Sequence, residues 1–305
     1  MRKFVCIFFA VLMLFSLCGC KAEEGKGIKI VTTVFPPYDF AKAIAGEAEM
    51  LIPAGSESHY FEPSLSDIAK IRSADLFIYA GDSIDPWAEK VLSSIEGSEV
   101  KILKMSDYVN LLEEESAVPG EHTHSHEETM DEHIWTSPKN AIIITQKIAE
   151  TLCEIDSENT EKYNKNCEDY VNQLKNLDRE LENTVSDGKT KTLVFADRFP
   201  FRYMAHDYNL ECFAAFSGCS TDTEPTLQTV KSLVEKIMSE NLPAVIITET
   251  TKGSVASAIA DKAGVKILTM NSCHNVSAKE KENGATYIDL MNENIKVLRE
   301  ALMCR

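Results

Sequence analysis

The sequence predicts an α/β fold of two lobes, each with a mainly parallel four-stranded sheet flanked by helices, joined by one long rigid helix. Short apolar runs alternate with amphipathic helical stretches in both halves of the chain, which is the pattern of parallel β-α-β units. Between the halves, residues 138–187 contain one proline and no glycine and keep a helical spacing of apolar residues. The chain has 305 residues, a length that suits two hydrophobic cores better than one.

Residues 1–19 have the features of a secretory signal peptide. Two basic residues precede an apolar run from Phe4 to Leu17 that is too short for a permanent membrane span. The run leads into Leu17-Cys18-Gly19-Cys20, which fits the lipobox of a bacterial lipoprotein, and residues 20–27 then form a polar tether. An ordinary signal peptide with a chance cysteine is the alternative. We therefore expect an extracytoplasmic protein that is anchored to the bacterial cell membrane by a lipid on Cys20.

The N-terminal α/β lobe is predicted over residues 28–156. Its amphipathic stretches are typical of surface helices that separate buried parallel strands. The predicted strands are residues 28–34, 49–54, 75–81 and 100–105, and the clearest helices are residues 64–74 and 86–97.

The connecting helix is predicted over residues 157–187, after a first helix that Pro138 opens. About 28 helical residues span roughly 40 Å at 1.5 Å per residue, so this helix can run the height of two lobes. Such a helix leaves little room for a wide hinge and places a cleft between the lobes.

The C-terminal α/β lobe is predicted over residues 188–305. No repeat of residues relates the two halves, so we expect them to resemble each other only in architecture. Its predicted strands are residues 191–197, 209–216, 243–250 and 265–271, and a final helix follows at residues 287–303.

The charge of the chain excludes some classes of partner. The formal net charge is −17, and Arg2 and Lys3 are part of the leader, so the mature chain is still more acidic. An acidic body repels nucleic acid and anionic membrane surfaces and tolerates cations.

The cysteines do not form a recognisable metal or redox motif. Three of the nine lie in the leader and lipobox, and no C-x-x-C pair occurs, which argues against a structural zinc ribbon. Cys212 and Cys219 are close enough in sequence to pair, but the pairing is open. The six cysteines of the body are Cys153, Cys167, Cys212, Cys219, Cys273 and Cys304.

Three histidines stand where ligands gather in α/β proteins, at or near the ends of strands or the start of a helix. His59 follows the second strand in a Gly/Ser turn, and His274 follows the last strand. His133 precedes Ile134 and Trp135, whose burial would fix its backbone. A surface position is the alternative for His59 and His133, and a plain turn for His274.

Three further histidines, His122, His124 and His126, belong to an acidic loop at residues 113–132. They alternate along a stretch with no apolar residue between Val118 and Met130, so they cannot converge on one ion in an extended chain. We interpret this loop as an auxiliary element that captures metal weakly, or as a plain solvated loop.

These motifs together resemble a known family. The lipobox, "ESHYFEPSLSDIAKIRSADLFIYAG", "DEHIWTSPKNAIIITQKIAETL", the long helix, "TLVFADRFPFRYMAHDYNL" and "TYIDLMNENIKVLREAL" are similar to the metal-specific substrate-binding lipoproteins of bacterial ABC importers. This is the cluster A family of zinc and manganese binders, and a His-rich loop is a typical feature of its zinc branch. The likeness covers nearly the whole mature chain.

The resemblance implies a metal site between the lobes. Carried over position by position, the first two ligands fall on His59 and His133, whereas the third falls on Ala196 and the fourth on Asn271. Alanine cannot coordinate a metal and asparagine is a poor anionic ligand, so half of the usual site is missing. We expect His274 to supply the third ligand. Asp197, Glu249 and Cys273 are the candidates for a fourth.

The resemblance also implies a function. It predicts a high-affinity receptor, not an enzyme, that captures Zn²⁺ between two lobes and delivers it to a membrane permease driven by a cytosolic ATPase. We expect a monomer that binds no nucleic acid. Three imidazoles favour zinc over manganese, which prefers carboxylate-rich octahedral sites, although a receptor for manganese or another divalent metal is the alternative.

Two other functional classes stay open. A zinc-dependent hydrolase could also use three ligands and a water, but the chain has neither H-E-x-x-H nor G-x-S-x-G. A surface adhesin that uses the metal only for stability is the second.

Overall fold

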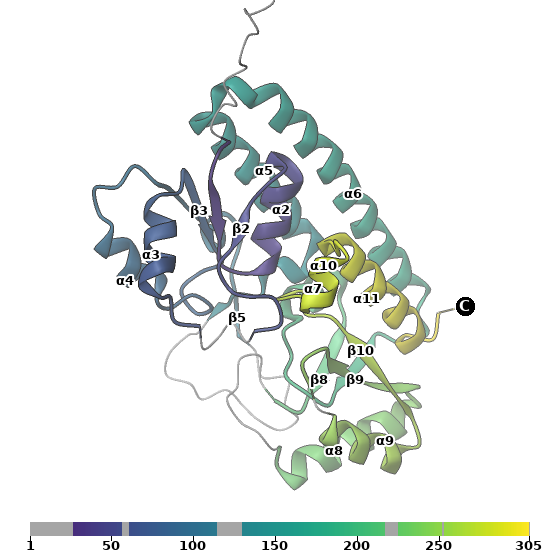
Figure 1. The fold of residues 1–305 in the computed structure, drawn as a ribbon. Coiled ribbons are helices and arrows are strands. Elements are labelled where there is room, and N and C mark those ends of the chain that lie inside the picture. Colours follow the sequence, from purple (N-terminus) through teal and green to yellow (C-terminus); the bar gives the residue numbers. More distant parts are fainter. Residues whose placement is uncertain (1–26, 57–60, 115–129, 217–224, 252, 305) are drawn as a thin grey trace, which may run out of the picture.

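The computed structural model describes residues 27–56, 61–114, 130–216, 225–251 and 253–304. In these residues the chain folds into two α/β lobes that lie along a pair of long helices (Figure 1). The predicted two-lobed α/β fold with parallel four-stranded sheets is confirmed. No helix in the described part of the chain combines the length and apolar character needed to cross a membrane.

The first lobe is built on a parallel sheet with the strand order β2-β1-β3-β4. All four residues of β3 are buried, as expected for a central strand of a parallel sheet. Its strands are β1 (Ile30–Thr32), β2 (Glu49–Met50), β3 (Leu76–Tyr79) and β4 (Lys101–Lys104). Its helices are α2 (Phe35–Ala45), α3 (Leu65–Arg72) and α4 (Ala88–Ser94).

An irregular segment leads from this sheet to the long helices. It contains an antiparallel pair of short strands and two 3-10 turns. These elements are η1 (Met105–Tyr108), β5 (Leu112–Glu113), β6 (Met130–Asp131) and η2 (Ile134–Thr136).

The second lobe repeats the architecture of the first. Its sheet has the order β10-β9-β7-β8, and in both lobes the first strand lies between the second and the third. The strands are β7 (Thr192–Phe195), β8 (Glu211–Ala214), β9 (Ala244–Thr248) and β10 (Lys266–Met270). The helices are α7 (Arg202–Tyr208), α8 (Leu227–Glu240), α9 (Ser254–Ala263), α10 (Ala278–Glu282) and α11 (Tyr287–Ala301).

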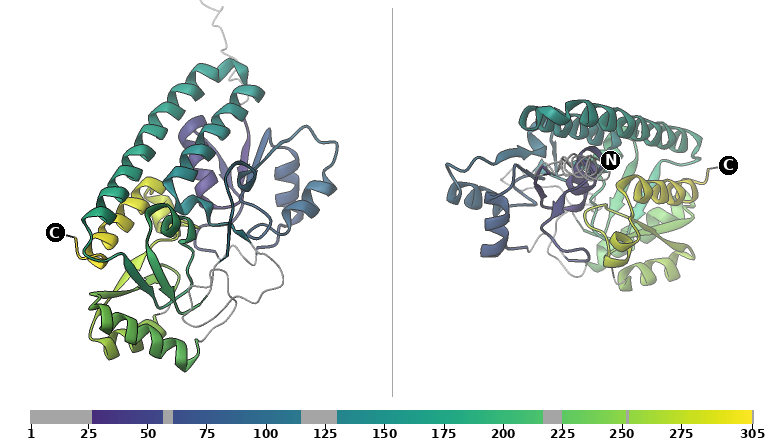
Figure 2. Two further views of the ribbon diagram at one scale, coloured as in Figure 1. Left: turned by 180° about the vertical axis from the view of Figure 1, so that it is seen from behind. Right: turned by 45° about the horizontal axis from the view of Figure 1, so that its top comes forward.

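The two long helices are α5 (Pro138–Ile155) and α6 (Thr160–Asp187), joined by the short turn η3 (Ser157–Asn159). Helix α6 has 28 residues and packs against α2 of the first lobe and α11 of the second. Figure 2 shows it running along the backs of both lobes. One hydrophobic core cluster contains residues of both lobes and of α6, so the lobes share packing instead of being linked only by a tether.

A buried carboxylate joins α2, α6 and α11. Asp39 on α2 accepts hydrogen bonds from the Tyr170 hydroxyl on α6 (2.8 Å) and from the backbone N–H of Tyr287 at the start of α11 (3.0 Å). Burial raises the pKa of Asp39, and these two hydrogen bonds partly oppose the shift. The junction ties both lobes to the connecting helix at one point.

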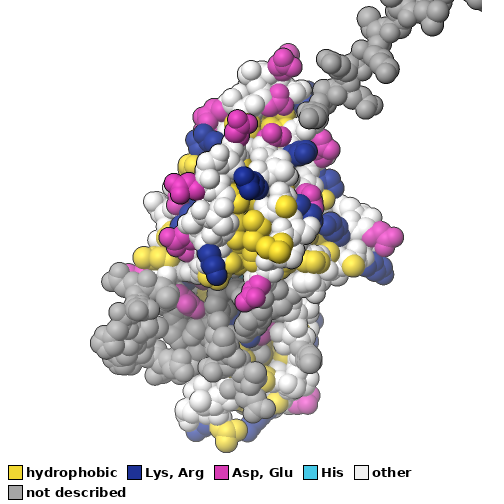
Figure 3. Space-filling view, turned by 60° about the vertical axis from the view of Figure 1, so that its left-hand side comes forward, with side chains coloured by type: hydrophobic (Ala, Val, Ile, Leu, Met, Phe, Trp, Pro, Cys, Tyr) yellow, Lys and Arg dark blue, Asp and Glu magenta, His cyan; other side chains and the backbone are white. Residues whose placement is uncertain are grey.

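The acidic composition does not give a uniformly acidic surface. On the face in Figure 3, basic and acidic side chains are interspersed around an apolar patch. Surface ion pairs such as Lys70–Glu49 (2.8 Å) and Lys104–Asp82 (2.5 Å) illustrate this mixing. Opposite charges are neighbours on this face, which weakens its long-range electric field.

Candidate metal centre

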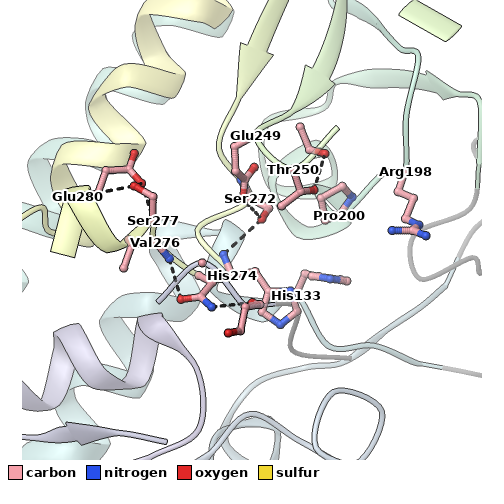
Figure 4. A pocket seen from close by; sticks show the side chains of 14 residues that line it. His133, Arg198, Pro200, Glu249, Thr250, Ser272, His274, Val276, Ser277 and Glu280 are labelled. Atoms are coloured by element: carbon pink, nitrogen blue, oxygen red, sulfur yellow. Dashed lines mark hydrogen bonds between the residues drawn. The ribbon is translucent and has the colours of Figure 1, made fainter. Parts of the chain in front are cut away.

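A cavity of about 640 Å³ lies between the lobes and is lined by residues of both. His133 enters from the first lobe, while Arg198, Glu249 and His274 enter from loops that follow β7, β9 and β10 of the second (Figure 4). Loops at the carboxyl ends of parallel strands are the usual place for ligands in such sheets.

His133 is held in one orientation by Asp131. The Asp131 carboxylate accepts the backbone N–H of His133 (2.8 Å) and also contacts its ring Nδ1 (3.0 Å). Because an ionised carboxylate only accepts, Nδ1 carries the hydrogen and Nε2 keeps its lone pair. This carboxylate–histidine pairing is the arrangement that orients metal-binding imidazoles in proteins.

His274 is held by its backbone. Its N–H donates to the Ser272 hydroxyl (3.3 Å), and its carbonyl accepts the N–H of Phe35, the first residue of α2 (3.3 Å). A histidine of the second lobe is thus attached directly to the first lobe. Both His133 and His274 are buried, with 2% and 9% of their surfaces exposed.

The two imidazole rings lie beside each other against Trp135. The ring centroids of His133 and His274 are 5.5 Å apart and the planes are perpendicular. Two imidazoles on one tetrahedral zinc, with Zn–N distances of about 2.0–2.1 Å, would have centroids about 5 Å apart. The observed separation is close to that value.

The remaining predicted imidazoles and the lipidation site cannot be placed beside them. His59, the loop histidines His122, His124 and His126, and Cys20 lie outside the described residues. Within the described ranges, no three His, Cys, Asp or Glu side chains are arranged to hold a metal. Ser56, the last described residue before the segment with His59, lines the cavity. The ligand role of His59 therefore stays a prediction.

Asp197 does not line the cavity. Its carboxylate accepts the backbone N–H of Thr248 (3.2 Å) and the hydroxyls of Thr248 and Thr251. These bonds join the end of β7 to the end of β9, so the carboxylate shapes the loops. Ala196 beside it is packed in the core of the second lobe.

Glu249 does line the cavity. Its carboxylate accepts the backbone N–H (2.9 Å) and the hydroxyl (2.7 Å) of Ser272, the residue that also contacts His274. Burial raises the pKa of Glu249, and the Ser272 hydrogen bonds oppose the shift. Glu249 thus supports the His274 loop from within the cavity wall.

Cys273 is fully buried in the hydrophobic core and is not part of the cavity wall. Its backbone has φ +57°, and its N–H donates to the Asn271 side chain (2.7 Å). Asn271 in turn exchanges hydrogen bonds with Asn294 on α11. Burial raises the pKa of the Cys273 thiol well above its usual value, which disfavours the thiolate that a metal requires.

Two contributors to the site were missed by sequence reasoning. Arg198 lines the cavity, and its position directly after the predicted strand at residues 191–197 was a usable signal. Asp131 was not singled out at all. Its signal was the D-x-H spacing to His133. The remaining described histidine, His206, is exposed on α7.

Comparison with known proteins places the chain in a family. Residues 30–301 match the family model for the zinc-uptake complex component A, periplasmic. The zinc-binding lipoprotein AdcA of Streptococcus pneumoniae is 32% identical over 303 residues, covering 95% of this chain and 60% of that protein. The high-affinity zinc uptake system protein ZnuA of Bacillus subtilis is 30% identical over 308 residues, covering 97% and 96%.

Solved structures agree with these relatives. The Zn(II)-bound ZnuA-like domain of Streptococcus pneumoniae AdcA has a TM-score of 0.76 at 31% identity and covers 90% of this chain and 98% of that chain. The laminin-binding protein Lmb of Streptococcus agalactiae has a TM-score of 0.76 at 25% identity and covers 90% and 100%. The chain belongs to the family of the zinc-uptake complex component A.

Proposed function

We propose that this protein is an extracytoplasmic receptor that captures Zn²⁺ between its two lobes and delivers it to the permease of an ABC transporter. The observation that carries the proposal is the meeting of His133 and His274, one from each lobe, with their ring centroids 5.5 Å apart. The printed names of the relatives, a zinc-binding lipoprotein and a zinc uptake protein, support the same ion.

Zinc suits the donor set better than manganese does. His133 and His274 offer imidazole nitrogen, and His59 would add a third. Zinc accepts such donors in tetrahedral geometry, whereas manganese prefers oxygen ligands in octahedral geometry. Manganese or another divalent metal is the alternative cargo.

The membrane partners follow from the proposed function. A lipid on Cys20 would hold the receptor near a permease that a cytosolic ATPase drives, and the receptor would act as a monomer. The shared core along α6 supports a receptor that changes shape little, so the permease would recognise a nearly rigid body.

Calorimetry with purified protein tests the metal site. We expect one zinc per chain, binding that survives deletion of residues 115–129, and loss of binding in a His59→Ala/His133→Ala double variant. This deletion keeps β5 and β6, whose ends at Glu113 and Met130 are described. The matched control is His206→Ala, which removes an exposed imidazole on α7. If zinc binding is lost on deletion of residues 115–129 and is unchanged in the double variant, the ion binds in the loop instead.

Surface adhesion is a second candidate function. The observation in its favour is the structural likeness to laminin-binding proteins, one of which is described as having both adhesin and metal-transporting activity. Retention of the purified protein on immobilised laminin, with and without zinc, is the direct test.

A further inference from the structure

The loop that carries His274 is fastened to the first lobe by its backbone. Its three consecutive residues His274, Asn275 and Val276 follow β10 of the second lobe and line the cavity (Figure 4). The His274 carbonyl accepts the N–H of Phe35 (3.3 Å), and the Val276 carbonyl accepts the N–H of Gly55 (2.7 Å). Phe35 and Gly55 follow β1 and β2, two neighbouring parallel strands of the first lobe. The loop thus reaches from its own lobe to the strand ends of the other.

The side chain of Asn275 adds two more bonds across the same boundary. Its Nδ2 donates to the backbone carbonyls of Pro53 (3.0 Å) and Ser56 (2.8 Å), in the turn after β2. Its Oδ1 accepts the N–H of Val276 (2.8 Å), so both ends of the amide are engaged and its orientation is fixed. We call the four cross-lobe hydrogen bonds of this loop the clasp.

The turn on the first lobe is shaped for this contact by Gly55. Its φ is +80°, in the left-handed region that glycine adopts without steric cost. A Cβ at this position would meet no atom within 4 Å, so the backbone conformation, and not a lack of space, favours glycine here. This conformation presents the Gly55 N–H to the Val276 carbonyl.

The clasp bears directly on the two imidazoles that line the cavity. His133 is oriented within the first lobe by Asp131. The clasp holds His274 against the same lobe, so it helps to set the 5.5 Å between the two ring centroids. A shift of about 1 Å in the support of a binding site is enough to loosen it.

We propose that Asn275 is a positioning residue of the metal site, which fastens the His274 loop to the first lobe and so holds the His274 imidazole beside that of His133. The inference rests on the proposed function, because it takes the two imidazoles to share the zinc ion. Asn275 acts through the backbone and not as a ligand, since its Nδ2 and Oδ1 are both engaged by main-chain groups.

Hydrogen exchange in the metal-free protein tests the clasp itself. Asn275→Ala removes the two side-chain bonds, so the loop can open without breaking them. We expect the N–H groups of Phe35 and Gly55 to exchange about tenfold faster in this variant. Asn166→Ala is the matched control, because Asn166 on α6 donates its amide to the Ile44 carbonyl (2.8 Å), away from the cavity wall. It should leave both exchange rates unchanged.

Zinc titration against a competing chelator tests the positioning role. Asn275→Ala should lower zinc affinity by about tenfold, as expected for a residue that orients a metal ligand, and Asn166→Ala should not. A double-mutant cycle then identifies the ligand that is affected. In a His274→Ala background the Asn275 substitution should change zinc affinity by less than about twofold, whereas in a His59→Ala background it should keep its full effect. A purely structural role would cost the same in both backgrounds.

Two results would overturn the inference. One is an unchanged zinc affinity in Asn275→Ala, and the other is an Asn275 effect that persists in the His274→Ala background. Asn275→Asp gives the same test if the alanine variant does not fold, because it keeps the acceptor for the Val276 N–H and loses both donors. Absence of zinc binding by the wild type would instead overturn the proposed receptor function, and hydrogen exchange would still report on the clasp.

Discussion

Tyr287 donates its hydroxyl hydrogen to the backbone carbonyl of Trp135 at 2.6 Å, across the boundary between the lobes. The indole N–H of Trp135 also reaches across this boundary and donates to the backbone carbonyl of Ser272 (3.0 Å). Trp135 lies two residues after His133, and Ser272 lies two residues before His274. Both histidines are therefore held by one set of buried hydrogen bonds, which we call the seam. Such support would hold the two proposed ligands in place before an ion arrives.

Replacing Tyr287 with phenylalanine should weaken both the fold and the metal site. The change leaves the Trp135 carbonyl without the buried donor it had, at a cost of about 1–3 kcal/mol in the free energy of unfolding. Urea denaturation measures that loss, and calorimetry should show weaker zinc binding.

Tyr208→Phe is the control for this prediction. The Tyr208 hydroxyl donates to Asp178 on α6 (2.6 Å), far in sequence from both histidine loops. We expect a similar loss of stability with zinc affinity unchanged. If the two variants bind zinc equally well, the seam contributes only to folding.

Asp131→Asn should lower zinc affinity by about ten- to 100-fold, the range found for partners that orient metal-binding imidazoles. An amide can present its NH₂ to Nδ1 and so favour the wrong tautomer of His133. Glu132→Gln is the control, because Glu132 is buried next to His133 but accepts the N–H of Ile84 (2.8 Å). Equal losses in both variants would indicate general damage to the loop.

Stability should depend on pH through Asp85. Burial raises its pKa from 3.8 to about 7, while its carboxylate accepts the Ala80 N–H (2.8 Å) and the Thr33 hydroxyl (3.0 Å). Between these pH values the folded protein holds a proton that the unfolded chain has lost, so its stability falls as pH rises, by up to about 1.4 kcal/mol per pH unit.

Asp85→Asn removes this titration. The amide oxygen can keep both accepted hydrogen bonds, so the variant should gain stability relative to the wild type between pH 5 and pH 7. Urea unfolding of the metal-free proteins at the two pH values gives the comparison. If the two proteins differ in free energy of unfolding by the same amount at both pH values, the pH dependence comes from other groups.

Cys273→Ala should leave zinc affinity within about twofold of the wild type, because the thiol is buried and away from the cavity wall and its thiolate is disfavoured. The folded wild type should also resist alkylation at Cys273, whereas Cys153, which is partly exposed, should react. A large loss of zinc affinity in the alanine variant would show that Cys273 is a ligand.

The elements could largely be predicted from the sequence, and two of the proposed ligands line one cavity. The glycine-free interval predicts α6. His274 follows a parallel strand, the usual place for a ligand, whereas His133 precedes η2 and lines the same cavity because the two lobes pack together. The relation between the lobes is visible in only a few residues. The segments "EPSL" and "EPTL" stand at the starts of the equivalent helices α3 and α8. The third residue of each, Ser64 and Thr226, is the N-cap, and the leucine is the first helical residue.

Side-chain directions could not be predicted in the same way. Cys273 and His274 are neighbours in one loop, yet the positive φ of Cys273 places its thiol in the core while His274 faces the cavity. That choice depends on Asn294 and Phe35, which are remote in sequence. The hydrogen bonds of Asp197 to two threonines depend in the same way on the pairing of β7 with β9.

The seam has a consequence for release. Tyr287 is hydrogen-bonded to Trp135 across the lobes. Asp39 accepts hydrogen bonds from α6 and from the first residue of α11, which is Tyr287 itself. Opening the lobes would have to break these buried hydrogen bonds, which slows spontaneous unloading. A receptor built in this way holds its cargo by default, and the work of emptying it must be done by the molecule that accepts the metal.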